Sequence, residues 1–191
     1  MQKGRANTPL FWSVLVVIVV ADIITKAIAV NALVLQRIPH RLFGDAVRFT
    51  LVYNPGAAFG LHLGQYSRWI FMVLTIGALV VLGRLYRATR DGDLWRTLAI
   101  SLVCGGAIGN LIDRIRSTQG VVDFIDVGIG TARWPTFNIA DMAVSTGAFL
   151  LAWVLWGEED APTPAASATP DGGATPPVSR VNTAPSGASD I

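Results

Sequence analysis

The side chains that could do chemistry gather in residues 104–141. Asparagine and aspartate recur there in the spacing Asn-x-x-Asp, once at Asn110 and Asp113 and once at Asn138 and Asp141. Residues i and i+3 share a helix face, so each pair would place an amide beside a carboxylate. Both pairs adjoin long apolar segments, where ionisable groups are costly enough to indicate a function. The pattern predicts a hydrolase working where membrane helices meet water.

The composition is that of a membrane protein. Of the 191 residues, 52% are hydrophobic and only 15% are charged, whereas a soluble domain carries roughly 25% charged residues. The basic residues form short clusters beside apolar runs, which favours membrane-flanking charge over nucleic-acid binding. The two histidines fit no metal-ligand spacing, and the single cysteine, Cys104, excludes an internal disulfide. We therefore expect no nucleic-acid partner, no metal and no cofactor.

Four apolar segments are long enough, or nearly so, to cross a bilayer, which takes about 20 residues. The predicted spans are residues 10–30, 69–86, 94–112 and 137–156. The first resembles a signal peptide with a cleavage site at residues 27–29, but its apolar character continues past Asp22, so we predict a retained helix. Asp22 and Lys26 lie four residues apart on it, the spacing of a structural ion pair that anchors this helix.

Two polar loops separate the predicted helices on one side. Residues 48–53 have the β-branched and aromatic content of a short strand, and Asn54 follows them in a turn sequence that by itself explains its presence. Residues 115–136 are predicted as a second long loop, with Asp126 in an exposed amphipathic turn. Both loops would lie at the same membrane face, because two helices connect them.

The C-terminal region differs from the rest. Residues 158–191 are rich in Ala, Pro and Thr and predict a disordered tail behind a membrane domain of residues 1–157. Four spans put both termini on one side of the membrane. A dense group of arginines after the second span, with Lys3 and Arg5, indicates that this side is cytoplasmic, although the opposite loops hold seven arginines if Arg114 and Arg116 are counted there, which makes the tally nearly even.

A pair of aspartates could hydrolyse a peptide without a metal or an activated serine or cysteine. Two close carboxylates share a proton, so one can act as base toward water and the other as acid. Asp141 lies at the start of a helix, where the helix dipole favours its ionised form. Its partner stays open. The repeated pattern favours Asp113, but the adjacent Arg114 would keep that carboxylate ionised, whereas the apolar sequence around Asp123 would raise its pKa.

Five motifs, taken together and in order, resemble one family. They are Asp22-x-x-x-Lys26, YNPGAAF at 53–59, GGAIGNLIDR at 105–114, VVDF at 121–124 and FNIAD at 137–141. The set, which covers roughly residues 10–157, resembles the lipoprotein signal peptidases, bacterial signal peptidase II. This resemblance implies an all-α polytopic membrane protein with four transmembrane helices and a small extracytoplasmic β-structure formed by the first loop.

The resemblance also implies the chemistry of the site. The catalytic dyad would be Asp123 and Asp141, near the extracytoplasmic face of the bacterial inner membrane. Asn54 and Arg114 would hold carbonyl groups of the substrate, and Gly56 would let the first loop close over it.

The remaining motif residues would support the dyad. Asn110 and Asp113 would fix the arginine and the two aspartates, and Asn138 would line the pocket. Asp22 and Lys26 match the first-helix pair of the family and keep their structural role.

The substrates implied are diacylglyceryl-modified prolipoproteins, cut just before the lipidated cysteine by a monomer that otherwise contacts membrane lipids. Two other classes compete. A proton-coupled carrier could use the buried charges as a relay, but the carboxylates cluster at one interface and no inverted repeat is visible. A non-catalytic lipid-binding scaffold would need no dyad at all. A presenilin-type protease would need a GxGD motif, and none occurs in the sequence.

Overall fold

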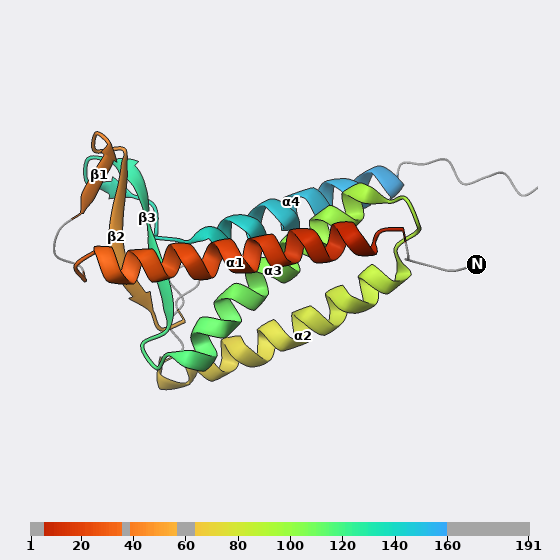
Figure 1. The fold of residues 1–191 in the computed structure, drawn as a ribbon, viewed down its shortest axis with the longest axis horizontal. Helices are drawn as coiled ribbons and strands as arrows, with labels where there is room; N and C mark the ends of the chain where they lie inside the picture. Colours follow the sequence, from red (N-terminus) through yellow and green to blue (C-terminus); the bar gives the residue numbers. More distant parts are fainter. Residues whose placement is uncertain (1–5, 36–38, 57–63, 160–191) are drawn as a thin grey trace, which may run out of the picture. The chain divides into compact units, whose positions relative to one another are not determined.

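The computed structural model describes residues 6–35, 39–56 and 64–159 (Figure 1). The predicted tail beyond residue 159, the basic residues before residue 6 and the second half of the 53–59 motif lie outside the described residues.

Four long helices confirm the predicted number of spans. They are α1 (Thr8–Ala32), α2 (Ser67–Ala88), α3 (Leu94–Arg116) and α4 (Ile139–Glu159). Among the described residues, these four helices are long and apolar enough to cross a membrane. The predicted boundaries needed correction at the polar junction, since α3 continues four residues beyond 112 and α4 begins two residues after 137.

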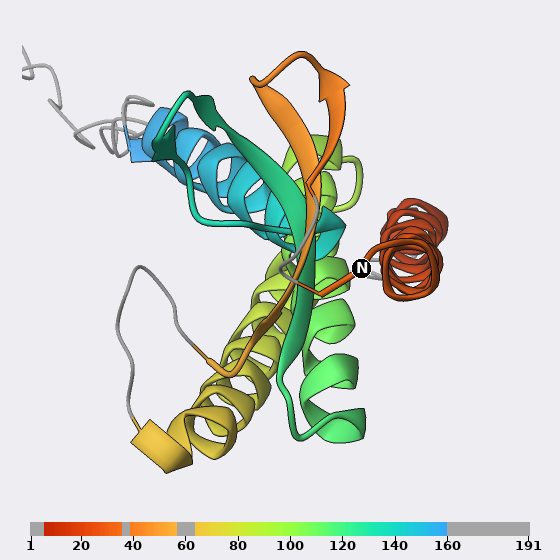
Figure 2. The same cartoon turned by 90° about the vertical axis from the view of Figure 1, so that its left-hand side faces the viewer.

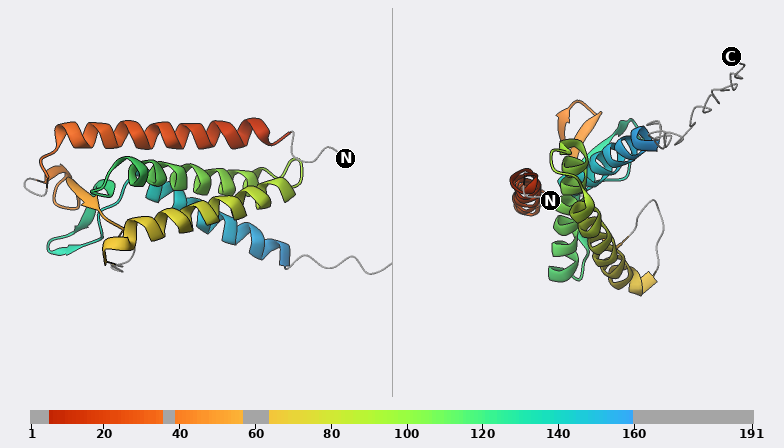
Figure 3. Two further views of the ribbon diagram at one scale, coloured as in Figure 1. Left: turned by 90° about the horizontal axis from the view of Figure 1, so that it is seen from below. Right: turned by 90° about the vertical axis from the view of Figure 1, so that its right-hand side faces the viewer.

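The third helix is the centre of the bundle. It contacts each of the other three helices, whereas α2 packs mainly against α3 and reaches α1 through Tyr86, whose ring stacks on Phe11. Figure 3 shows α1 running alongside α3, with α2 and α4 diverging on the other side. The buried contact includes Phe11 and Leu15 of α1, Leu82 of α2, and Ile100 and Cys104 of α3. Cys104 is therefore a packed core residue.

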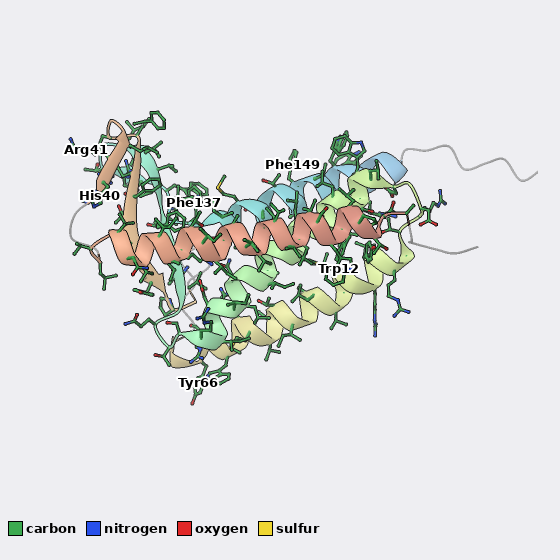
Figure 4. All side chains as sticks on the ribbon, viewed as in Figure 1. Trp12, His40, Arg41, Tyr66, Phe137 and Phe149 are labelled. Carbon is green, nitrogen blue, oxygen red and sulfur yellow. The ribbon has the colours of Figure 1, made fainter. Side chains whose placement is uncertain are left out.

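The outward faces of the helices carry large apolar side chains. Trp12 on α1 and Phe149 on α4 are 55% and 78% exposed and project from the bundle (Figure 4). Helices this apolar on their exposed surface are suited to a lipid environment, because hydrocarbon imposes no cost on such side chains. The charged residues of the bundle concentrate instead at its two ends.

A four-stranded antiparallel sheet lies across one end of the bundle (Figures 1 and 2). The strands, in spatial order, are β1 (His40–Phe43), β2 (Val47–Asn54), β3 (Val121–Ile129) and β4 (Ala132–Arg133). The short 3₁₀ helix η1 (Gly64–Tyr66) precedes α2. The strand predicted at 48–53 is confirmed within β2.

The sheet draws on both loops, so the expectation that the first loop alone forms it was wrong, as was the assignment of residues 115–136 as loop. β3 pairs with β2 in antiparallel register, Val52 opposite Asp123 and Arg48 opposite Asp126. A register shift between Phe49 and Val52 marks a β-bulge, a feature that re-aims side chains near active sites. The two aspartates interrupt the apolar run of β3, which concealed the strand in the sequence.

Candidate active site

The start of α4 is fixed by the second Asn-x-x-Asp pair. The Asn138 side-chain oxygen accepts a hydrogen bond from the Asp141 backbone N–H at 2.9 Å, and Asp141 Oδ2 accepts one from the Asn138 backbone N–H at 3.2 Å. This reciprocal arrangement is a capping box, which satisfies helix N–H groups that would otherwise be unpaired. The spacing had suggested that Asn138 and Asp141 share a helix face. Instead, Asn138 precedes the helix and caps its first turn. The cap holds the Asp141 carboxylate at the positive end of the helix dipole.

The same asparagine connects Asp141 to Asp123. Its side-chain Nδ2 lies 2.7 Å from Asp123 Oδ1 and 3.1 Å from Asn110 Oδ1, and Asn110 Nδ2 donates to Asp141 Oδ1 at 2.7 Å. Asn138 is completely buried and Asp123 is 3% exposed. The structure thus brings together β3, the end of α3 and the start of α4 around two carboxyl groups.

Backbone pairing explains how β3 reaches this position. The segment before α4 joins the strand at Phe137, whose carbonyl accepts hydrogen bonds from the backbone N–H groups of Phe124 and Ile125. Phe137 in turn donates to the Ile125 carbonyl at 3.0 Å. Because Asp123 and Asn138 each adjoin these paired residues, their side chains meet without a long flexible connection. Figure 2 views the molecule from this end, with β3 crossing in front of α3 and α4.

The environment of Asp123 makes it a weak acid. Burial raises its pKa, and the nearby Asp141 charge raises it further, to about 7. Hydrogen bonds from Asn54 and Asn138 and the charge of Lys26 act in the opposite direction without cancelling the rise. At neutral pH such a carboxyl group can either hold or release a proton, which is the property a general acid or base requires.

Asp113 has a different partner from the one its sequence neighbour suggested. The Lys26 ammonium lies 2.9 Å from Asp113 Oδ2, and the same oxygen accepts the Val122 backbone N–H at 3.2 Å. Adjacent residues on a helix do not face each other, and among the described residues no ion pair joins Asp113 to Arg114. Asp113 joins α1, α3 and the first residues of β3, and its role in fixing the arginine stays a prediction.

The predicted ion pair on α1 is present and reaches further than expected. Lys26 Nζ lies 2.7 Å from Asp22 Oδ2, and Asp22 Oδ1 accepts the Ala140 backbone N–H at 2.9 Å in the first turn of α4. A Cβ atom on Gly109 would stand 2.5 Å from the Asp22 carboxylate, so glycine is required for this close approach. Lys26 also donates to Asn110 Oδ1 at 2.9 Å. The pair thus touches the groups that hold both predicted catalytic residues.

Asn54 and Gly56 lie at the end of β2. Asn54 Oδ1 accepts the Gly56 backbone N–H at 3.0 Å, an Asx turn, and the Asn54 side chain also hydrogen-bonds Asp123. Asn54 is consequently more than a turn residue. Gly56 has φ +117°, and a Cβ there would stand 2.9 Å from the Ser67 Cβ, so both its conformation and its packing favour glycine.

Arg114 lies beside this network on the last turn of α3. Its Nη1 donates to the Asn110 carbonyl at 3.2 Å, and its guanidinium stands 5.6 Å from the centre of the Phe71 ring. Its Nε is buried and has no hydrogen-bond partner among the described residues. An arginine held in this way has an N–H group available for a carbonyl oxygen.

Two residues at the start of α2 were not recognised from the sequence. Arg68 Nε donates to the Arg114 carbonyl at 2.6 Å and so caps the end of α3, and Phe71 supplies the ring under the guanidinium. The only available signal was an arginine and an aromatic residue at a predicted interface, and neither specifies a distant partner.

Asp126 is not in an exposed turn, so that prediction was wrong. It is 6% exposed on β3, where Arg48 and Arg133 reach its carboxylate at 3.1 and 2.8 Å and Thr50 donates to it at 3.1 Å. Burial alone would raise its pKa, but the hydrogen bonds from Arg133, Thr50 and Arg48 outweigh burial and lower it. Asp126 is an ionised anchor of the sheet.

The arrangement at the junction of β3, α3 and α4 supports acid–base chemistry. It contains two carboxyl groups sharing an amide partner, a buried ammonium, and a guanidinium with an unused N–H. Among the described residues no group of three His, Cys, Asp or Glu side chains is placed to hold a metal ion.

Comparison with known proteins gives consistent matches. The family described as Signal peptidase (SPase) II matches residues 14–156. A lipoprotein signal peptidase of Mycobacterium tuberculosis (strain ATCC 25618 / H37Rv) is 40% identical over 160 residues, which are 78% of this chain and 75% of that protein. Two solved bacterial membrane enzymes, determined by the in meso method, are 30% and 32% identical with TM-scores of 0.73 and 0.69. They cover 84% and 81% of this chain and 95% and 96% of their own chains.

Proposed function

This chain belongs to the signal peptidase II family of membrane aspartic peptidases, and we propose that it removes the signal peptide from diacylglyceryl-modified prolipoproteins by cutting just before the lipidated cysteine. The chain is a multi-pass bacterial membrane hydrolase of the lipoprotein-processing class. The observation that carries the finer proposal is the single Asn138 residue that hydrogen-bonds both Asp123 and Asp141 in a buried site.

In the proposed mechanism, the two aspartates act on one water molecule. The Asp141 carboxylate accepts a proton from water, the water oxygen bonds to the scissile carbonyl carbon, and Asp123 gives its proton to the carbonyl oxygen. In the second step the C–N bond breaks, the leaving amine takes the proton from Asp141, and a hydroxyl proton of the diol returns to Asp123. The products are a carboxylic acid and the amino group of the lipidated cysteine, and the dyad regains its initial state.

Binding of the peptide would use the polar groups beside the dyad. The unpartnered Nε–H of Arg114 can donate to a substrate carbonyl, and its guanidinium is oriented by Phe71 and the Asn110 carbonyl. Asn54, next to Asp123, is positioned to hold a second carbonyl group. Gly56 adjoins the first loop, which we propose closes over the peptide.

The placement of the site fits a lipid-modified substrate. The proposed dyad has one residue on β3 and one at the start of α4. This end of the four helices, beside the sheet, is opposite the ends where α1 begins and α4 finishes (Figure 1). We propose that this end is extracytoplasmic and that both termini are cytoplasmic, in the bacterial inner membrane. The acyl chains can then remain in the bilayer while the peptide enters from its surface, and a monomer surrounded by lipid suffices.

The test is cleavage of a diacylglyceryl-modified prolipoprotein by the purified protein in detergent, with the new N-terminus identified by mass spectrometry. We expect wild type to release a product beginning at the lipidated cysteine. Asp123→Asn and Asp141→Asn should each lose about 10²–10⁴-fold in kcat, the usual contribution of a general acid or base. Both variants must remain folded, with a cooperative unfolding transition at least as stable as that of wild type.

Asp113→Asn is the matched control, because it lies in the same polar network without contacting either carboxyl group. We expect it to retain measurable cleavage. Full activity of Asp123→Asn would exclude the proposed dyad, and absence of cleavage by wild type would favour the carrier, which ion-flux measurements in vesicles would then detect.

A further inference from the structure

Lys26 is a buried charge surrounded by polar partners. Its ammonium has three N–H donors and three acceptors, Asp22 Oδ2 at 2.7 Å, Asp113 Oδ2 at 2.9 Å and Asn110 Oδ1 at 2.9 Å. The residue is 4% exposed. If its role were only to neutralise Asp22, the bond to the neutral amide of Asn110 would be unnecessary.

That bond determines which way the Asn110 amide faces. Lysine donates hydrogen bonds and accepts none, so the atom opposite its ammonium must be the amide oxygen. The oxygen also accepts from Asn138 Nδ2 at 3.1 Å, which leaves the Asn110 NH₂ group facing Asp141 Oδ1 at 2.7 Å.

The orientation has a consequence for Asp141. One carboxylate oxygen accepts the Asn110 NH₂ group and the other accepts the Asn138 backbone N–H at 3.2 Å. These two hydrogen bonds fix the position of the Asp141 carboxylate. Burial and the Asp141 charge favour the protonated form of Asp123.

Resting on the dyad assigned above, we propose that Lys26 is a positioning residue that acts through Asn110: it fixes the Asn110 amide so that the NH₂ group holds the Asp141 carboxylate in place for the attacking water. The resting site is thereby prepared for Asp141 to accept a proton from water and for Asp123 to donate one. Lys26 touches neither carboxyl group, so it takes no part in the proton transfers themselves.

The charges around Lys26 come from every element packed against it. Asp22 lies on α1, Asp113 and Arg114 on α3, Asp141 on α4 and Asp123 on β3. Removing the ammonium takes away the positive charge that faces these four carboxyl groups. The Lys26 charge lowers the pKa of Asp123, so its loss should raise that pKa and move the basic limb of a pH–rate profile to higher pH.

A simple Lys26→Met variant leaves Asp22 buried and unpaired, which can unfold the protein. The decisive variant is therefore Asp22→Asn/Lys26→Met, which keeps the net charge and keeps an acceptor for the Ala140 N–H. If the two residues form only a structural ion pair, this isosteric replacement should restore both folding and activity, since buried ion pairs are often replaceable by uncharged groups.

We expect the double variant to unfold at nearly the wild-type temperature but to lose activity. Its kcat for the lipidated substrate should fall about tenfold or more, with KM within about twofold, because the group lost stabilises the reacting state of the dyad and not substrate binding. The basic limb of its pH–rate profile, which reports Asp123, should move to higher pH. Arg84→Met, which removes an exposed positive charge far along α2, should leave the profile unchanged.

A second readout does not depend on cleavage. Infrared titration of the protonated carboxyl band, identified by its loss in Asp123→Asn, should show the band persisting to higher pH in the double variant than in wild type. Wild-type kcat and an unshifted band in the folded double variant would overturn the role of Lys26 and leave the peptidase standing. A shifted band in a protein that cleaves no prolipoprotein would support the role of Lys26 and reject the proposed substrate.

Discussion

Asp123 and Asp126 lie three residues apart on β3, are both buried, and have opposite surroundings. Asp123 meets amide groups and a second carboxyl group, and its pKa rises to about 7. Asp126 meets two guanidinium groups and a hydroxyl, and its pKa falls. An odd spacing on a strand points the two side chains to opposite faces, one toward the helix ends and the other toward the arginines of the sheet. Burial is thus common to both, and the charge of the partners decides which carboxyl group can exchange a proton near neutral pH.

The largest expected effect is on stability as a function of pH. Because the folded-state pKa of Asp123 is raised from 3.8 to about 7, its contribution to stability is complete below about pH 4 and is lost as pH rises through 7. A shift of about three units corresponds to about 4 kcal/mol. Since asparagine does not ionise, Asp123→Asn should be up to about this much more stable than wild type at pH 8, with the gain vanishing near pH 4.

Denaturant unfolding in detergent, followed by tryptophan fluorescence at pH 4, 6 and 8, measures this difference. Asp141→Asn provides a comparison, since removing its charge should lower the pKa of Asp123 and also stabilise the protein at high pH. A gain in Asp123→Asn that stays constant with pH would contradict the raised pKa.

Asp126 should behave in the opposite way. Its lowered pKa means that its stabilising contribution is present above its ordinary pKa range and is lost as pH falls through the lowered value. Asp126→Asn should destabilise the protein by about 3 kcal/mol at pH 7, because Arg48 and Arg133 lose their shared anion. Cleavage per folded molecule should be retained.

Asp45→Asn is the control for this variant, since Asp45 also pairs with Arg48 but its side chain is 44% exposed. Its removal should cost less than about 1 kcal/mol, as is usual for exposed pairs. If Asp45→Asn and Asp126→Asn destabilise the protein equally, burial adds nothing to the contribution that the Asp126 ion pairs make to stability.

The smallest predicted effect is on kcat/KM, and it should distinguish the two arginines on the two sides of the sheet. Arg133 is engaged by Asp126 and by the Asp45 carbonyl, whereas the Arg114 Nε has no hydrogen-bond partner in the part of the chain that the structure describes. Arg114→Lys should lower kcat/KM about tenfold, because lysine lacks the planar set of donors and stacks poorly on Phe71. Arg133→Lys should change kcat/KM less than about twofold. Equal losses in the two variants would remove the reason to assign substrate contact to Arg114.

The helices could be predicted from the sequence with errors of only a few residues. A segment in lipid must satisfy its backbone hydrogen bonds internally, so a long apolar run specifies a helix with little help from distant residues. The strand β2 was likewise recognisable from its β-branched and aromatic residues. The strand β3 was not, because the two aspartates in its apolar run resemble a polar loop until the partners on β2 and before α4 are known.

Within the site, residue type and spacing indicated which side chains matter but not how they pair. The local pattern favoured Asp113 beside Asp141, while the desolvated context favoured Asp123, and only the resemblance to a family distinguished them. In the structure Asp113 is engaged by Lys26 from α1, 87 residues earlier in the chain, and Asn138 serves as a helix cap that also reaches Asp123.

The sequence by itself determined the membrane class, the four helices, the polar junction and the family, because each depends on local composition or on contiguous motifs. Only the tertiary structure decided that Lys26 orients Asn110, that Asp126 is an ionised anchor of the sheet and that β3 carries Asp123 to the start of α4. These are contacts between residues far apart in the chain. Their energies depend on distance, burial and the polarity of the partner, which spacing along the sequence does not encode.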